Sequence, residues 1–300
     1  METVALDSDL VRSLLREQFP QWRDERVRPV EVQGWDNRTF RIGDDIVARL
    51  PSAAGYAQAV AQEHRWLPVL APQLPVPIPI PVAQGRPGCG YPWPWSLYRW
   101  LPGTVARPDE VAESVLLAED LAGFLVALQS VDASSGPTAG VHNGWRGAPV
   151  TTYDAEVRTT AAALADELHL PAVLGVWTAA ITAAPAGAAV WVHGDFTGSN
   201  LLVQDGRLAA VIDFGSCAVG DPACDLVIAW TLLHGPARAA FRAGVPGDVA
   251  AWARARGWAL WKALLTSAQG ADGRAAEKRF GWRCSAGQLI NELIADLGDP

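Results

Sequence analysis

The dipeptide Asp205-Gly206 sets the local geometry in the middle of this 300-residue chain, because it is among the strongest short signals for a two-residue β-turn. Two β-type runs flank it, residues 201–204 and 207–212. A hairpin with so short a turn has a fixed register, so the residues at its open end lie side by side. Those residues are Asn200 and Asp213. The sequence therefore predicts an amide and a carboxylate held next to each other.

A second carboxylate precedes the hairpin. The apolar run 189–192 is typical of a buried strand, and it ends in His193-Gly194-Asp195, five residues before Asn200. Mg²⁺ prefers hard oxygen ligands and usually takes only one or two from protein, while phosphates and water supply the rest. If Asn200 and Asp213 are those ligands, Asp195 is left to accept a proton from a nucleophile. These are the parts of a phosphoryl-transfer site.

The motifs H-G-D-x-x-x-x-N at 193–200 and I-D-F-G at 212–215 resemble the H-R-D-x-x-x-x-N and D-F-G motifs of protein kinases. With Gly194 inside the first motif and G-D-P-A-x-D-L at 220–226, the chain more specifically resembles the aminoglycoside phosphotransferase family. That family of small-molecule kinases also includes macrolide, choline-type and homoserine-type kinases. No activation segment ending in A-P-E follows D-F-G, which disfavours protein-kinase activity.

The resemblance implies an α+β fold with two lobes, like that of protein kinases. The N-terminal lobe should hold a five-stranded antiparallel sheet with helices, and the C-terminal lobe should be mainly helical. We place the lobes at 1–98 and 105–300, with a hinge at 99–104. Strands are predicted at 30–32, 39–42, 46–50, 80–84 and 96–100. Helices are predicted at 7–19, 56–70 (broken at Pro68), 109–131, 153–168, 172–184, 225–234, 236–243, 247–271 and 285–297.

The resemblance places a phosphate-covering loop at residues 34–38. Gly34 is its only glycine, where protein kinases have three, and Asp36 and Asn37 can bend the chain through bonds from side chain to backbone. An ordinary β-turn explains these two residues equally well. By position, the hinge offers the Arg99 carbonyl and the Leu101 amide to the purine.

Arg49 stands where the kinase string V-A-I-K has its phosphate-binding lysine. No lysine occurs before Lys262, so Arg49 takes that role or no residue of the first lobe does. Arginine binds phosphate with a larger, forked group, which makes the change non-conservative. Glu63, the only acid of helix 56–70, is expected to pair with Arg49, and Tyr98 is expected to line the back of the purine site.

Three further residues are expected to support the loop that bears Asp195. His193 should bond to backbone and stiffen the loop rather than act as an acid or base. Asp225, together with Asp221, should brace the loop from behind. Both are also suitable N-caps for a helix that begins near Pro222, and the two roles can coincide.

The implied reaction moves the γ-phosphoryl group of ATP or GTP to a hydroxyl of a small molecule, with Mg²⁺. The net charge of −8 lies entirely in residues 101–300, which argues against a nucleic-acid partner and favours a cationic acceptor. An aminoglycoside-type antibiotic is thus the first acceptor to consider, with a role in antibiotic resistance. An ordinary acidic surface explains the charge equally well.

Several alternatives stay open. A macrolide is another possible acceptor, since the tryptophans of the C-terminal helices are either core or a stacking surface for sugars (Trp252, Trp258, Trp261 and Trp282). Another small molecule such as an amino-alcohol is a further alternative. Because Arg49 and the single-glycine loop depart from the kinase pattern, a third hypothesis is that the chain is a nucleotide-binding pseudokinase or regulator. We expect free thiols at the four cysteines, a cytoplasmic location without membrane contact, and a monomer or weak dimer.

Overall fold

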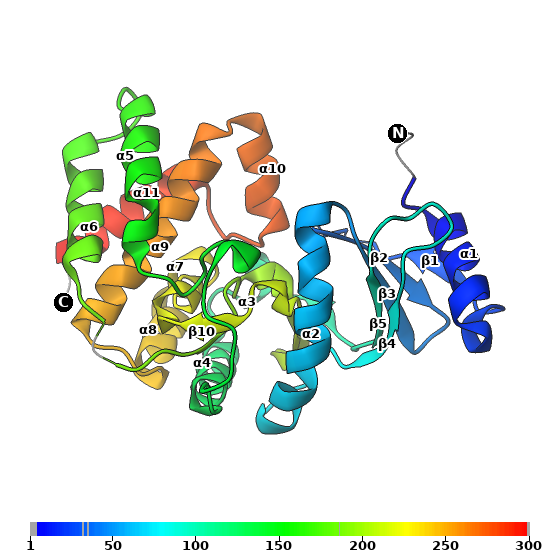
Figure 1. Cartoon of the computed structure of the whole chain (residues 1–300). Coiled ribbons are helices and arrows are strands. Elements are labelled where there is room, and N and C mark those ends of the chain that lie inside the picture. Colours follow the sequence, from blue (N-terminus) through cyan, green and yellow to red (C-terminus); the bar gives the residue numbers. More distant parts are fainter. Residues whose placement is uncertain (1–4, 32, 35, 186, 299–300) are drawn as a thin grey trace. The chain divides into compact units, whose positions relative to one another are not determined.

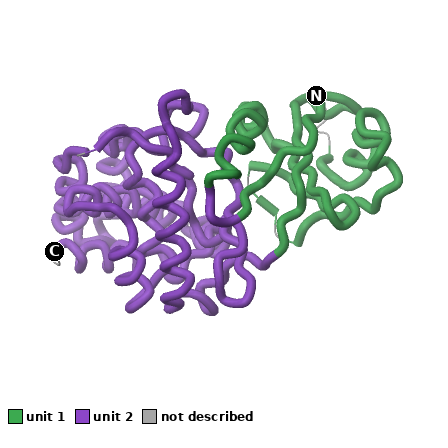
Figure 2. Tube along the Cα trace, turned by 90° about the horizontal axis from the view of Figure 1, so that it is seen from below, with its two compact units in different colours: residues 1–73, 77–102 green, residues 74–76, 103–300 purple. Residues whose placement is uncertain are grey.

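The computed structural model describes residues 5–31, 33–34, 36–185 and 187–298. The chain divides into two compact units (Figure 2). Unit 1 comprises residues 1–73 and 77–102, and unit 2 comprises residues 74–76 and 103–300.

Unit 1 is built on a five-stranded antiparallel sheet with the order β1-β2-β3-β5-β4 (Figure 1). Its strands are β1 Val27–Pro29, β2 Asn37–Ile42, β3 Ile46–Pro51, β4 Pro81–Gly85 and β5 Trp95–Arg99. Along β3 the side chains alternate between the two faces, so Ile46, Ala48 and Leu50 enter the core while Arg49 points to the opposite face. The predicted sheet is confirmed, and its alternation fixes which face Arg49 can serve.

Two helices cover the faces of this sheet (Figure 1). Helix α1 (Ser8–Gln18) is capped by Asp7, whose Oδ1 accepts from the N–H groups of Asp9 and Leu10, and its apolar stripe packs on the core face. Helix α2 (Ala57–Leu70) turns Glu63 toward the other face. Short 3₁₀ turns complete the unit at Pro20–Trp22, Ala54–Tyr56 and Ala71–Gln73.

Two predictions in unit 1 need correction. The first strand ends at Pro29 instead of covering 30–32, because β1 is an edge strand and a proline, which lacks an N–H, suits the end of such a strand. Val32 of the predicted strand lies outside the described residues. Helix α2 is not broken at Pro68. The proline lies in the last turn with its ring exposed, where only one helical hydrogen bond is lost.

Unit 2 is mainly helical, as predicted. Its helices are α3 Pro108–Val111, α4 Val115–Ser130, α5 Asp154–Ala163, α6 Leu170–Thr182, α7 Ile228–Thr231, α8 Gly235–Gly244, α9 Val249–Ala268, α10 Ala271–Arg279 and α11 Ala286–Ala295. Short 3₁₀ segments lie at Val141–Asn143, Val150–Tyr153, Gly198–Asn200, Phe214–Ser216, Pro222–Asp225 and Asp296–Gly298. Among the described residues, no helix is both long and apolar enough to cross a bilayer.

Three predicted helices have different bounds in the structure. The predicted helix 109–131 is two helices, because Ser114 interrupts it and caps α4 by accepting from the N–H of Leu117. The predicted helix 247–271 ends at Ala268, and α10, which was not predicted, follows it. The predicted helix 225–234 is a 3₁₀ turn and the short α7.

Two small sheets in unit 2 position the motifs. Strand β7 (Val190–Val192) pairs with β10 (Ala218–Gly220), and β8 (Leu201–Gln204) lies between β6 (Thr104–Val105) and β9 (Arg207–Val211). The predicted hairpin is present: Gln204 pairs with Arg207, and both turn residues are left-handed, with φ of 53° at Asp205 and 74° at Gly206. This is the conformation that favours Asp-Gly at such a turn.

The structure agrees with the interpretation of the tryptophans as core residues and of the cysteines as free thiols. The four C-terminal tryptophans are at most 7 % exposed and belong to the core: Trp252, Trp258 and Trp261 lie on α9, and Trp282 lies between α10 and α11. The four cysteines are free thiols (Cys89, Cys217, Cys224 and Cys284).

Candidate active site

The loop after β7 is held from behind by Asp225. Its Oδ2 accepts from the N–H of His193 at 2.6 Å, and its Oδ1 accepts from the N–H of Gly194 at 2.8 Å. Burial raises the pKa of Asp225, although these two N–H groups and the nearby His193 ring favour the ionised form. Gly194 has a φ of 82°, and a Cβ there would lie 2.4 Å from the Ser216 carbonyl oxygen, so the loop requires glycine at this position.

The His193 side chain is fully buried and contacts backbone. Its Nε2 lies 3.0 Å from the carbonyl oxygen of Ile212, and its ring packs edge-on to Phe214 with centroids 4.7 Å apart. These contacts tie the loop to the end of the hairpin. They leave no exposed ring atom for acid or base chemistry.

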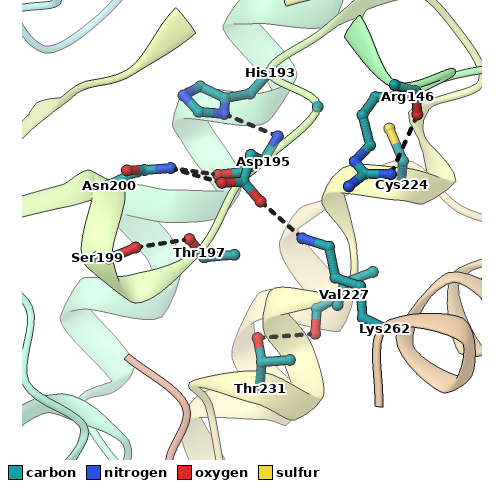
Figure 3. A network of polar contacts seen from close by, with 12 residues as sticks. Arg146, His193, Asp195, Thr197, Ser199, Asn200, Cys224, Val227, Thr231 and Lys262 are labelled. Atoms are coloured by element: carbon teal, nitrogen blue, oxygen red, sulfur yellow. Dashed lines mark hydrogen bonds and ion pairs between the residues drawn. The ribbon is translucent and has the colours of Figure 1, made fainter. Parts of the chain in front are cut away.

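Asn200 joins Asp195 to the hairpin. Its Nδ2 donates to the Asp195 carbonyl oxygen at 2.9 Å and to Asp195 Oδ2 at 3.2 Å (Figure 3). The backbone carbonyl of Asn200 accepts from the N–H of Ile212 at 2.9 Å, which extends the β8–β9 pairing to the residue before Asp213. The β8–β9 register shifts by one residue between Leu202 and Val203, and this irregularity brings Asn200 next to the Ile212–Asp213 backbone.

Asp213 has a left-handed backbone, with a φ of 64°. For a residue with a side chain this conformation costs free energy and persists where the surrounding structure enforces it, often at functional sites. The Nδ2 of Asn200 is bonded to Asp195, so its Oδ1 is the atom that remains for a cation. An amide oxygen and a carboxylate at neighbouring positions fit the ligand preference of Mg²⁺.

Lys262 completes this site, and sequence reasoning missed it. It projects from α9, and its Nζ lies 2.8 Å from Asp195 Oδ1. Burial alone would raise the pKa of Asp195, but the Lys262 ammonium, with Arg146 and His193 contributing less, outweighs it and holds that pKa below its usual value. Asp195 is therefore ionised near neutral pH, as a proton acceptor must be.

Helix α9 also contacts Asp221, a second acid of the motif region, through Arg254. Asp221 receives two bonds from Arg254, from Nε at 2.6 Å and from Nη2 at 3.1 Å, and both side chains are almost fully buried. The Oδ1 of Asp221 also accepts from the N–H of Ala223 and caps the 3₁₀ turn that follows. The structure therefore separates the two acids: Asp225 bonds to the loop, while Asp221 caps a turn and anchors it to α9.

A signal for Lys262 was present in the sequence. Arg254, Trp258 and Lys262 are spaced by four residues, which places them on one face of a helix. Two cations on one face of a mainly apolar helix require buried acidic partners. Sequence alone could not name those partners, since Asp221 and Asp195 lie 33 and 67 residues away.

Unit 1 brings together three of the residues predicted to serve the nucleotide. Arg49 Nη1 lies 3.0 Å from Glu63 Oε1, and the hydroxyl of Tyr98 donates to Glu63 Oε2. All three side chains are largely buried. Burial and the charge of Glu63 raise the pKa of Tyr98 well above its ordinary value, so it remains a neutral donor.

The other predicted residues of unit 1 lie around strand ends. The Gly34 carbonyl accepts from Arg38 Nη1 at 2.8 Å, and Asn37 opens β2 opposite Pro51. Trp35, in the same loop, lies outside the described residues. Arg99 ends β5 with its N–H bonded to the Ile80 carbonyl, and Leu101 follows in the connection that leads out of the unit.

Solved structures share the fold of this chain at low sequence identity. The GDP and kanamycin complex of APH(2")-IIia matches with 19 % identity and a TM-score of 0.70, over 95 % of this chain and 98 % of that one. The streptomycin-ATP-APH(2")-IIa ternary complex matches with 17 % identity and a TM-score of 0.61, over 96 % and 99 %. The macrolide 2'-phosphotransferase MphH from Brachybacterium faecium matches with 25 % identity and a TM-score of 0.62, over 96 % and 98 %.

These likenesses confirm the kinase-like fold that the motifs predict. No curated protein matches the chain. The family model described as the phosphotransferase enzyme family (APH) matches residues 26–258, which is well over half of the sequence and includes the motifs at 193–200, 212–215 and 220–226. The chain belongs to this family of phosphotransferases.

Proposed function

We propose that this enzyme transfers the γ-phosphoryl group of ATP or GTP to a hydroxyl group of a small molecule. The observation that carries the proposal is the environment of Asp195. It is an ionised carboxylate, on a loop braced by Asp225, beside the hairpin end that bears Asn200 and Asp213. Structures similar to this chain contain GDP, ADP or ATP, which supports a nucleotide donor.

In this mechanism, Asp195 orients the acceptor hydroxyl and takes its proton as the oxygen attacks the γ-phosphorus. A bond forms between that oxygen and phosphorus, the bond to the β–γ bridging oxygen breaks, and a nucleoside diphosphate leaves. Asn200 Oδ1 and the Asp213 carboxylate would hold Mg²⁺, which when bound neutralises phosphate charge. Asn200 also fixes Asp195 Oδ2, so the metal ligand and the base are positioned together.

The residues of unit 1 would bind the nucleotide. We assign Arg49 to the α- and β-phosphates, with Glu63 and Tyr98 holding its guanidinium in place. Gly34 and Asn37 would contribute the loop over the phosphates. The Arg99 carbonyl and the Leu101 amide would contact the purine.

For the acceptor, the acidic balance of residues 101–300 supports an aminoglycoside-type antibiotic, but one observation favours a second class. Lys262 and Arg146 both place positive charge near Asp195. The Arg146 guanidinium lies 4.5 Å over the Trp261 ring, which stacks on Tyr153 at 4.1 Å. Cations beside the base disfavour a polycationic acceptor, so a mainly neutral hydroxyl compound of the macrolide class is the second candidate.

The proposal is tested by a panel of aminoglycosides, macrolides and amino-alcohols, each incubated with Mg²⁺ and either ATP or GTP. We expect mass spectrometry to detect a phosphorylated product in one class. The Asp213→Ala variant should lose Mg²⁺-dependent nucleotide binding in calorimetry. Wild-type protein that binds nucleotide yet phosphorylates nothing in the panel would instead support a pseudokinase or regulator.

A further inference from the structure

Lys262 is one of only two lysines in the chain, and its environment is unusual for that residue type. Its neighbours along α9 are buried, its own side chain is 15 % exposed, and its Nζ contacts Asp195 Oδ1 (Figure 3). Among the described residues, Asp195 provides the one acceptor bonded to this ammonium. A lysine ammonium has three donors, so two remain available.

The second cation nearby, Arg146, is differently placed. Its Nη1 donates to the Gly144 carbonyl at 3.3 Å and to the Tyr153 hydroxyl at 3.4 Å, while its guanidinium covers Trp261. Arg146 is thus bonded to its own loop and to an aromatic ring. Lys262 is the cation that touches the base and keeps donors for a ligand.

The two oxygens of Asp195 have separate partners. Oδ2 accepts from Asn200 Nδ2 at 3.2 Å, and Oδ1 accepts from Lys262 Nζ at 2.8 Å. An acceptor hydroxyl must lie within hydrogen-bond reach of this carboxylate. The phosphoryl group in transfer then lies just beyond that hydroxyl, in line with it. A donor already in contact with the carboxylate is therefore close to the equatorial phosphoryl oxygens.

We propose that Lys262 is a further catalytic residue, which fixes one oxygen of Asp195 and donates a hydrogen bond to the phosphoryl group during transfer. This inference rests on the proposed function. The proton of the acceptor goes to Asp195, so Lys262 takes no part in proton transfer. Its contribution is electrostatic: charge spreads over the equatorial oxygens in the transition state, where a pre-positioned donor is most effective.

The test uses assays that need no known acceptor. Nucleotide hydrolysis with water as acceptor is measured in a single turnover, and Mg·ADP affinity is measured by calorimetry. In the Lys262→Met variant we expect the hydrolysis rate to fall about 100-fold, the effect of removing one such donor, while Mg·ADP affinity stays within about threefold. Lys262→Arg should recover part of the rate, because it restores the charge in a bulkier form.

The matched control is Lys278→Met, which removes the chain's other lysine from an exposed position on α10. It should behave as wild type.

If Lys262→Met does not fold, Lys262→Gln provides the same comparison, since it keeps a donor for Asp195 without the charge. A neutral variant with wild-type or faster hydrolysis would overturn the proposal and make the ion pair a resting contact. Wild-type protein that neither binds nor hydrolyses nucleotide would instead refute the proposed function, and this inference with it.

Discussion

Each unit of the molecule pairs a cation with a carboxylate at residues that we assign to the reaction, and the two pairs are built in opposite ways. In unit 1 the acid is the more buried partner: the side chain of Glu63 is 6 % exposed and that of Arg49 is 13 % exposed. In unit 2 the cation is the more buried partner: the side chain of Lys262 is 15 % exposed and that of Asp195 is 32 % exposed. In both pairs the more exposed side chain is assigned contact with substrate, and in unit 2 Lys262 is assigned a contact with the phosphoryl group as well.

The difference has a physical basis. Burying a charged pair costs desolvation free energy that the attraction between the charges often does not recover, so such a pair is weak evidence for a gain in stability. A buried partner can instead hold the other charge in one orientation. By this argument Glu63 positions a cation for phosphate, with help from Tyr98, and Lys262 positions an anion for a proton. We therefore expect variants of the unit 1 pair to change nucleotide binding and variants of the unit 2 pair to change the transfer step.

The largest effect is expected for Asp195→Asn. The amide cannot accept the acceptor's proton, and Lys262 loses its counter-charge. Loss of a general base typically lowers rates by 10² to 10⁴, so we expect turnover to fall about 1,000-fold, while nucleotide affinity stays near wild type. Asp166→Asn, an exposed acid of the same unit, is the matched control. Normal turnover in Asp195→Asn would remove the basis for the comparison between the pairs.

A smaller effect, on stability, is expected where α9 pairs with Asp221. Asp221→Ala leaves Arg254 buried without its carboxylate, and breaking such a pair should lower the free energy of unfolding by about 3 kcal/mol. Chemical denaturation measures this change. The control is Asp109→Ala, whose pair with Arg107 is exposed at both ends and should contribute nothing measurable. Equal losses in the two variants would show that α9 does not anchor the motif region.

The contacts that could be predicted from the sequence are those between residues that lie close together in the chain. The turn at Asp205-Gly206 and the spacing from Asp195 to Asn200 are local, and local chemistry was enough to place them. Arg49 and Glu63 are 14 residues apart on consecutive elements, so the pair could be anticipated. The hydrogen bond from the Tyr98 hydroxyl to Glu63 could not be anticipated, because nothing in the local sequence indicates it.

The spacing of Arg254, Trp258 and Lys262 could be noticed in the sequence, but it did not indicate that Lys262 contacts Asp195. Helix α9 is buried on nearly all sides, so its periodicity does not show which face meets the catalytic loop. Only tertiary packing decides that. Helix ends were missed for a different reason, because at Ser114 the capping side chain outweighed the apolar pattern that continued through it.

The smallest effect is expected for Glu63→Gln, which tests the pair of unit 1. The amide can still accept from Tyr98, but without its charge it holds the Arg49 guanidinium less firmly. We expect nucleotide affinity to fall about tenfold, or about 1.4 kcal/mol, with little change in kcat at saturating nucleotide. Asp44→Asn, which neutralises an exposed carboxylate paired with Arg41 in the same unit, should leave both values unchanged. If Glu63→Gln lowered kcat instead and left affinity intact, Glu63 would act on the chemical step, and the two pairs would no longer serve different ends of the reaction.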